Sequence, residues 1–250
     1  MPVLITELLS RADTGISVKP FICKTEEEKE IYVKPPGSLR RLLISEWIGG
    51  RLAQYMELPC AEITIVEIPE LLAKANKNPD WYDFRAGIGF GSYSVAKNHR
   101  DLLASDISKL PRDLLAEIYL FDYWISNQDR KMGPIAGNPN MLVAFDVSTI
   151  CLIDHDSAFD TTFNIKGFKD DHLGRTTAEI RTNKDKQQAW LEKAALALSN
   201  LEKIWEELPE YWLHSDLDTS LDPVYTIDHY RTHLNKPFVD TEYFWKELLQ

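Results

Sequence analysis

Strand-like and helix-like segments are segregated along this chain, and their segregation is what most constrains its fold. Four short segments with apolar or alternating residues lie in the first third, at 16–24, 30–34, 61–68 and 86–95. A single amphipathic helix over 42–55 interrupts them, with apolar residues at three- and four-residue spacing. A short helix and a loop are expected over 70–80. Such segregation predicts an α+β fold.

The rest of the chain is mostly helical in pattern. Pro111 is suited to the first turn of a helix, and apolar residues from Leu114 to Ile125 supply its buried face. Two apolar runs, 141–145 and 150–153, are too short for helices and predict a β-hairpin. Apolar residues from Trp190 to Leu208 fall on one further helical face. We therefore expect one domain with two lobes, over residues 1–95 and 96–250, and a ligand cleft between them.

Composition limits the partners and the compartment. The 250 residues carry a net charge of −11, which argues against a nucleic-acid binder and against an anionic membrane surface. The N-terminus lacks the pattern of a signal peptide, and no apolar run is long enough for a membrane span. Cys23, Cys60 and Cys151 form neither a disulfide framework nor a zinc pattern. We expect reduced, mostly buried thiols in a cytoplasmic protein.

Five polar residues follow one another in an informative order. Lys34 ends a predicted strand, and Glu46 lies on the following helix. Asp129 follows the second long helix, Asn140 lies beyond it, and Asp154 ends an apolar strand. A strand lysine can bind nucleotide phosphates and be oriented by a glutamate. A loop aspartate can accept a hydroxyl proton, and an asparagine with a second aspartate can hold Mg²⁺. This set is typical of protein-kinase phosphoryl transfer.

Each of these residues also has an ordinary structural interpretation. Lys34 and Glu46 taken alone could be solvated surface residues, and Asp154 could cap a turn.

Other motifs fail on inspection. Asp154 and Asp156 begin like a calcium loop, but its twelfth position is Ile165 rather than Glu. His229 and His233 have zinc-helix spacing, yet Tyr230 replaces the glutamate base, so we expect a surface helix there. Three glycines alternate at strand spacing, without the lysine of a phosphate-binding Walker loop; they are Gly87, Gly89 and Gly91.

The sequence resembles the HipA-like kinases, in particular a short branch without the separate N-terminal domain of the HipA toxins. The most specific similar stretches are Asn127-Gln128-Asp129-Arg130 and Leu152-Ile153-Asp154-His155. The first of these ends a longer similar stretch that begins with Phe121-Asp122-Tyr123-Trp124-Ile125-Ser126. The other similar stretches are Lys19-Pro20-Phe21, Tyr32-Val33-Lys34, Ser45-Glu46, Gly50-Arg51-Leu52-Ala53, Glu57-Leu58-Pro59, Phe90-Gly91-Ser92 and Asn140-Met141-Leu142-Val143. The resemblance covers about residues 15–160.

The resemblance implies a bilobal protein-kinase-like fold that binds Mg-ATP and transfers the γ-phosphoryl group to a Ser or Thr hydroxyl of a protein. It implies that Lys34 binds phosphates and pairs with Glu46. It also implies that Asp129 is the catalytic base and that Asn140 and Asp154 bind Mg²⁺. Some relatives are toxins that phosphorylate aminoacyl-tRNA synthetases and are neutralised by a partner protein, so a companion antitoxin is one expectation.

Three departures from the family pattern stand out. The phosphate loop is poor in glycine, with only Gly15 beside Ser17, although its backbone amides could still cradle phosphate. Asn140 follows Asp129 by 11 residues, where the usual kinase loop has about five, so Asn138 competes for the metal role. Asp156 stands where a glycine is expected. That carboxylate could join the metal shell or hinder loop movement.

Two other functions stay open. The acidic balance would suit a small-molecule phosphotransferase with a cationic substrate. The thin glycine loop and Asp156 would suit a pseudokinase that acts by binding a partner. The serines that could accept an autophosphorylation are Ser10, Ser17, Ser92 and Ser94, and the sequence selects none of them.

Overall fold

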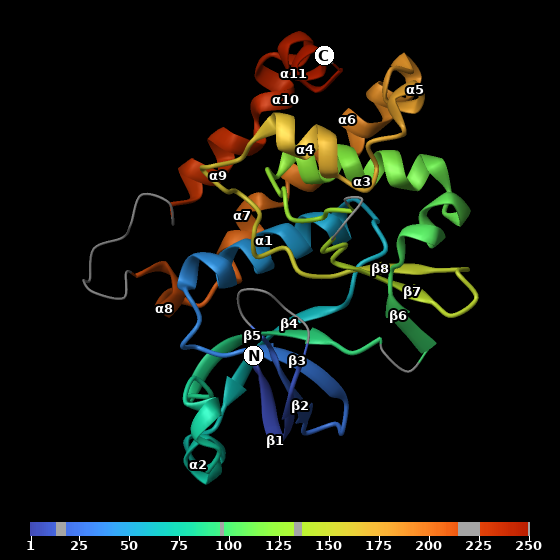
Figure 1. Cartoon of the computed structure of the whole chain (residues 1–250). Helices are drawn as coiled ribbons and strands as arrows, with labels where there is room; N and C mark the ends of the chain where they lie inside the picture. Colours follow the sequence, from blue (N-terminus) through green and yellow to red (C-terminus); the bar gives the residue numbers. More distant parts are fainter. Residues whose placement is uncertain (14–18, 96–97, 133–136, 215–225, 250) are drawn as a thin grey trace.

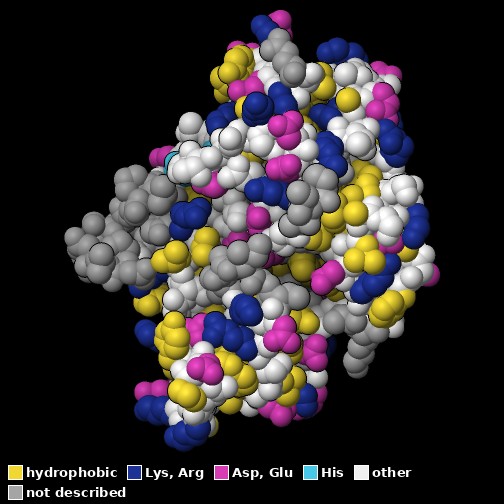
Figure 2. Space-filling model, viewed as in Figure 1, with side chains coloured by type: hydrophobic (Ala, Val, Ile, Leu, Met, Phe, Trp, Pro, Cys, Tyr) yellow, Lys and Arg dark blue, Asp and Glu magenta, His cyan; other side chains and the backbone are white. Residues whose placement is uncertain are grey.

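The computed structural model describes residues 1–13, 19–95, 98–132, 137–214 and 226–249. The five strands of one sheet gather at one end of the molecule and most helices at the other, with helix α1 (Arg40–Tyr55) between them (Figure 1). The predicted mixture of a strand-rich first third and a helix-rich remainder is therefore present. Basic and acidic side chains are mixed over the face shown in Figure 2.

Five strands form a closed barrel in the order β1-β2-β3-β5-β4. They are β1 (Val3–Arg11), β2 (Phe21–Thr25), β3 (Glu30–Lys34), β4 (Ile63–Ile68) and β5 (Gly87–Tyr93). Neighbours pair antiparallel except β1 and β4, whose parallel pairing closes the barrel. Closure leaves no unpaired edge for another chain to extend.

The barrel interior follows from the period-two alternation of its strands. Phe21 and Cys23 are buried and lie opposite Val33 and Ile31 in the β2–β3 register. β5 can pack closely against its neighbours in the barrel because Gly91 has no side chain. A Cβ at this position would lie 2.6 Å from a methyl group of Val66. The strand spacing of the glycines thus reflects close packing inside the barrel.

Strand β1 was not predicted, and its pairing explains why. Its register with β2 shifts between Ile5 and Glu7 and again between Leu8 and Ser10. Each such irregularity breaks the alternation of buried and exposed residues by which a strand is recognised.

A second sheet has the order β6-β7-β8. The predicted hairpin is present as β7 (Met141–Ala144) and β8 (Ile150–Leu152). Strand β6 (His99–Asp101) pairs with β7 and was not predicted, because its three residues are all polar and give no apolar alternation.

Helices cover the remainder of the chain. The α-helices are α2 (Glu70–Ala75), α3 (Arg112–Trp124), α4 (Ile165–Asp171), α5 (Ala178–Arg181), α6 (Lys184–Leu198), α7 (Leu201–Glu206), α8 (Glu210–Leu213), α9 (Ile227–Leu234), α10 (Lys236–Val239) and α11 (Thr241–Leu249). Two 3₁₀ helices are η1 (Pro79–Trp81) and η3 (Ala104–Lys109). The single apolar face expected from Trp190 to Leu208 divides between α6 and α7.

Helices α1 and α3 run through the larger hydrophobic core. Both carry long runs of buried residues. Two indole groups fix their neighbours: Trp47 Nε1 donates to the carbonyl of Ile204, and Trp124 Nε1 donates to that of Leu234. The polar end of each ring is thus satisfied while its apolar body packs in the core.

The burial and the oxidation state of the cysteines can be compared directly with expectation. Cys23 and Cys151 are buried, Cys60 is partly buried, and all three are free thiols. Burial raises the pKa of the Cys60 thiol to about 11, so it stays protonated near neutral pH.

Among the described residues, no helix combines the length and the apolar character that crossing a bilayer requires.

Helix α9 is less exposed than a surface helix. His233 Nε2 lies 3.0 Å from the carbonyl oxygen of Trp124, and the ring packs on Phe159. Its Nδ1 lies 3.3 Å from the Lys236 amine. Burial and the Lys236 charge lower the pKa of His233 to about 4. The neutral ring therefore joins α9 to the end of α3. Because both of its nitrogens already have close polar neighbours, this contact argues against a metal role for His229 and His233.

Acidification should destabilise the protein through His233. The unfolded chain binds a proton near pH 6.5, whereas the folded chain binds it only near pH 4. The contribution of this group is complete above pH 6.5 and is lost as the pH falls towards 4, on the order of 3 kcal/mol. Urea unfolding from pH 7 to pH 4 should show a smaller pH dependence for His233→Gln than for wild type. An unchanged pH dependence would contradict this role.

Candidate active site

Lys34 is the last residue of β3 and is buried against α1. Its Nζ lies 2.6 Å from Oε1 of Glu46, near the middle of that helix. Both side chains are almost fully buried. An ion pair in such surroundings survives only where the geometry is close and the remaining polar atoms are bonded. The barrel and the axial helix α1 are therefore joined by a buried charge pair.

The segment after β8 brings two further carboxylates to the same amine. Lys34 Nζ lies 2.8 Å from Oδ1 of Asp154 and 2.8 Å from Oδ2 of Asp156. The second oxygen of Glu46 accepts the backbone N–H of His155 at 2.7 Å. Glu46 therefore holds Lys34 with one oxygen and the 154–156 segment with the other. In Figure 2, acidic side chains are visible where the barrel and the helices meet.

Burial and charge shift the titration of this group in opposite directions. Burial alone would lower the pKa of Lys34, but the three carboxylates outweigh it and raise that pKa well above its ordinary value. Burial raises the pKa of Glu46 to about 8, although Lys34 opposes the shift. The pKa of Asp154 is lowered, because the nearby Lys34 outweighs burial. The cluster therefore holds more carboxyl groups than the single ammonium of Lys34 can neutralise.

Asp129 lies in the loop after α3 and accepts two amide hydrogen bonds. Its Oδ2 is 2.7 Å from Nδ2 of Asn138 and 3.2 Å from Nδ2 of Asn140. Burial raises the pKa of Asp129, as do the charges of Asp154 and Asp156, while the two amide bonds oppose the shift. Asp129 is only partly buried, so it is not closed off from solvent.

The β7–β8 hairpin brings Asn140 beside the 153–154 segment. Asn140 directly precedes β7, and Asp154 is the second residue after β8. Because the strands are antiparallel, the carbonyl of Asn140 accepts the N–H of Ile153 at 3.1 Å. Asn140 and Asp154 both have positive φ, +43° and +59°. Such conformations cost energy and cluster at functional sites.

A second buried charge group, centred on Asp122, supports the loop that carries Asp129. Asp122, in the last turns of α3, accepts Nε of Arg130 at 2.8 Å and Nδ2 of Asn127 at 3.0 Å. His172 Nε2 lies 2.9 Å from the same carboxylate. Since His172 Nδ1 accepts the N–H of Gly174, its Nε2 carries the proton and donates. Arg130 in turn donates to the carbonyls of Asn140 and Ile153.

This group fixes the loop on both sides. Asn127 Oδ1 accepts the backbone N–H of Asp129 at 3.2 Å, and Arg130 holds the backbone next to Asn140 and Asp154. Arg130 therefore links the loop that carries Asp129 to both ends of the hairpin.

The structure brings together Lys34, Glu46, Asp154 and the unexpected Asp156, and it places Asp129 with both candidate asparagines. Gly15 and Ser17 lie outside the described residues. Sequence reasoning missed Asp122 and His172. Asp122 gave two signals, a charge within an apolar helical run and a place in the stretch similar to the HipA-like kinases, but no role was assigned to it. His172 gave none because it lies 50 residues further along the chain.

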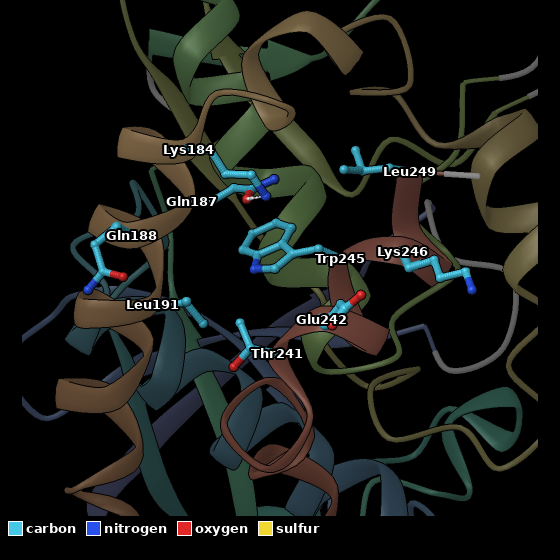
Figure 3. Close-up of a pocket in the computed structure, with 9 residues that line it drawn as sticks. All are labelled: Lys184, Gln187, Gln188, Leu191, Thr241, Glu242, Trp245, Lys246 and Leu249. Carbon is cyan, nitrogen blue, oxygen red and sulfur yellow. Dashed lines mark hydrogen bonds between the residues drawn. The ribbon is translucent and has the colours of Figure 1, made fainter.

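The hollow shown in Figure 3 lies elsewhere. It measures about 660 Å³ and is lined by residues of α6 and α11, among them Trp245 and Lys184. None of its lining residues belongs to the site described above.

Removing the charge of Asp122 should destabilise the fold. Asp122→Asn leaves the Arg130 guanidinium buried without its counter-charge, which typically costs about 3–5 kcal/mol. Asp113→Asn on the same helix is the matched control, because its ion pair with Lys186 is exposed and should matter far less. Urea unfolding of both variants decides the point. Equal losses of stability in the two would contradict a supporting role for Asp122.

Comparison with known proteins concerns the fold and the family of the chain. A structure titled "Crystal structure of A Helicobacter pylori proinflammatory kinase CtkA" is 11% identical, with 92% of each chain covered and a TM-score of 0.54. Structures of the Golgi casein kinase, one with Mn/ADP bound, are 13% identical with TM-scores of 0.49 and 0.45; the alignments cover 99% of this chain and 71% and 72% of theirs. No curated protein sequence matches significantly. Residues 5–248 match the model of a family described as HipA-like kinase, and the chain belongs to that family.

Proposed function

We propose that the protein is an ATP-dependent kinase that transfers the γ-phosphoryl group to a Ser or Thr hydroxyl of another protein. The observation that carries the proposal is the convergence of Lys34, Glu46 and Asp154 in one contact group. Membership of the HipA-like kinase family supports a phosphotransferase in general. The proposal includes a bilobal arrangement, with residues 1–95 as the small lobe and residues 96–250 as the large lobe.

The residues present fit a nucleotide with a divalent cation. Asp154, Asp156 and Glu46 offer carboxylate oxygens that lie within 4.8 Å of one another. Asn140 uses its amide nitrogen on Asp129, so its amide oxygen is the atom left for a metal. Oxygen donors of these kinds suit Mg²⁺. Bound Mg²⁺ would neutralise negative charge on the phosphates.

Asn140 is a better candidate than Asn138 for the metal role. Its backbone carbonyl is held by both Ile153 and Arg130, which places the residue beside the segment that carries Asp154. Asn140 is also buried, whereas Asn138 is only partly buried. A side chain held in this way is better organised for metal binding.

The protein's own groups have distinct tasks in this proposal. Lys34 binds phosphate oxygens, and Glu46 keeps its ammonium in place. Asp129 orients the substrate hydroxyl and accepts its proton as the hydroxyl oxygen bonds to the γ-phosphorus and ADP leaves. The raised pKa of Asp129, caused mainly by burial, makes its carboxylate a stronger base than that of an exposed aspartate.

Two isosteric variants test the proposal. Asp129→Asn removes the base, and Asp154→Asn removes a metal ligand; each should lower phosphoryl transfer by about 10²-fold or more. Asp146→Asn, in the exposed turn between β7 and β8, should keep full activity. Transfer is measured with γ-labelled ATP and a cell lysate, followed by mass spectrometry of the labelled proteins.

Unfolding temperatures should show that all three variants fold. Full phosphoryl transfer by folded Asp129→Asn and Asp154→Asn variants would overturn the assigned roles. Labelling of amino-sugar or nucleoside acceptors, with no labelled protein, would instead identify a small-molecule phosphotransferase. Nucleotide binding without transfer to any acceptor would identify a pseudokinase.

A further inference from the structure

Lys34 has no free hydrogen-bond donor in this structure. An ammonium group has three N–H donors, and Lys34 Nζ faces three carboxylates at 2.6, 2.8 and 2.8 Å. A phosphate oxygen can therefore bind this amine only after one of these contacts is given up. Which contact is given up depends on what else can stabilise the released carboxylate.

Glu46 keeps its contact in the proposed function, and of the two aspartates Asp156 is the harder to release without compensation. Its side chain is 5% exposed, against 30% for Asp154. Its Oδ1 accepts the hydroxyl of Ser157 at 3.1 Å, and its ion pair is with Lys34. If Lys34 turned towards phosphate, Asp156 would remain buried beside Asp154 and Glu46 with no cation. Burial of an unpaired charge is strongly unfavourable.

The charges of the cluster point the same way. Even with Glu46 counted as neutral, since burial raises its pKa to about 8, two aspartates face one ammonium. This leaves a formal excess of one negative charge at the place where a polyanionic nucleotide is proposed to bind. Water cannot screen this excess well, because Lys34, Glu46 and Asp156 are buried. A divalent cation would remove the excess and give Asp156 a partner in place of Lys34.

We infer that Asp156 couples the release of Lys34 to the binding of a divalent cation, so that the cation binds before the nucleotide and without its help. The inference rests on the proposed function and adds an order of binding to it. Asp156 is in this sense a positioning residue, because it acts on the nucleotide through Lys34. A neutral residue at this position would leave Lys34 free for phosphate whether or not a metal is present.

The test compares ADP affinity with and without Mg²⁺. Isothermal titration gives the dissociation constant of ADP in excess Mg²⁺ and in excess chelator. The constant in chelator divided by the constant in Mg²⁺ measures the coupling. The ratio for wild type should exceed that for Asp156→Asn by about 5- to 150-fold, the usual range of coupling between two ligands. Most of the change should appear as tighter ADP binding by the variant in chelator.

A second titration uses the metal alone. Mn²⁺ added to the nucleotide-free protein should bind wild type more tightly than Asp156→Asn, by a factor in the same range. Asp156→Gly serves as the second variant if the asparagine repacks the segment. Asp146→Asn is the control, since it removes an exposed carboxylate outside the cluster and should behave as wild type in both titrations.

The outcomes separate this inference from the proposed function. Equal ADP ratios for wild type and both Asp156 variants would overturn the inference and leave the kinase proposal standing. If no form binds ADP at any metal concentration, the kinase proposal fails. The Mn²⁺ titration then decides the coupling role, because equal Mn²⁺ affinity in wild type and the Asp156 variants would overturn it as well.

Discussion

The contact between the Lys34 ammonium and three carboxylates is the interaction that joins the parts of this molecule. It connects the end of β3 in the barrel, the middle of α1, and the segment that follows β8. Glu46 follows Lys34 by only 12 residues, whereas Asp154 lies 120 residues further along the chain than Lys34. Their relative positions are therefore held at one buried point by charge rather than by apolar contact alone.

Much of this arrangement could be predicted from the sequence. The order Lys34, Glu46, Asp129, Asn140 and Asp154 indicated kinase chemistry because each residue type stood on, or next to, a suitable predicted element. The barrel strands with regular alternation were also predicted. Local patterns suffice where a strand has one buried face or where an apolar run delivers a polar residue to its end.

The parts that could not be predicted depend on long-range or irregular structure. Strand β1 carries two register shifts, and β6 is too short and polar to show a pattern. His172 reaches Asp122 from 50 residues away, and no local rule connects them. The triple contact of Lys34 was missed for the same reason: Asp156 looked like a departure from a family pattern, and only the packing of its segment against β3 shows what the carboxylate touches.

The two buried charge groups differ in balance, and this difference separates their roles. Around Asp122, one carboxylate faces one guanidinium, and burial lowers the pKa of His172, so that its ring stays neutral and the group closes without excess charge. Around Lys34, three carboxylates share one ammonium.

A balanced group needs nothing from outside and can serve the fold alone. An unbalanced group is unfavourable as it stands, and the protein tolerates it only because the rest of the fold supplies enough stability. Any cation that enters the Lys34 cluster recovers that cost as binding energy. The charge imbalance, more than the presence of acidic residues as such, is therefore what marks the surroundings of Lys34 as a place for a ligand.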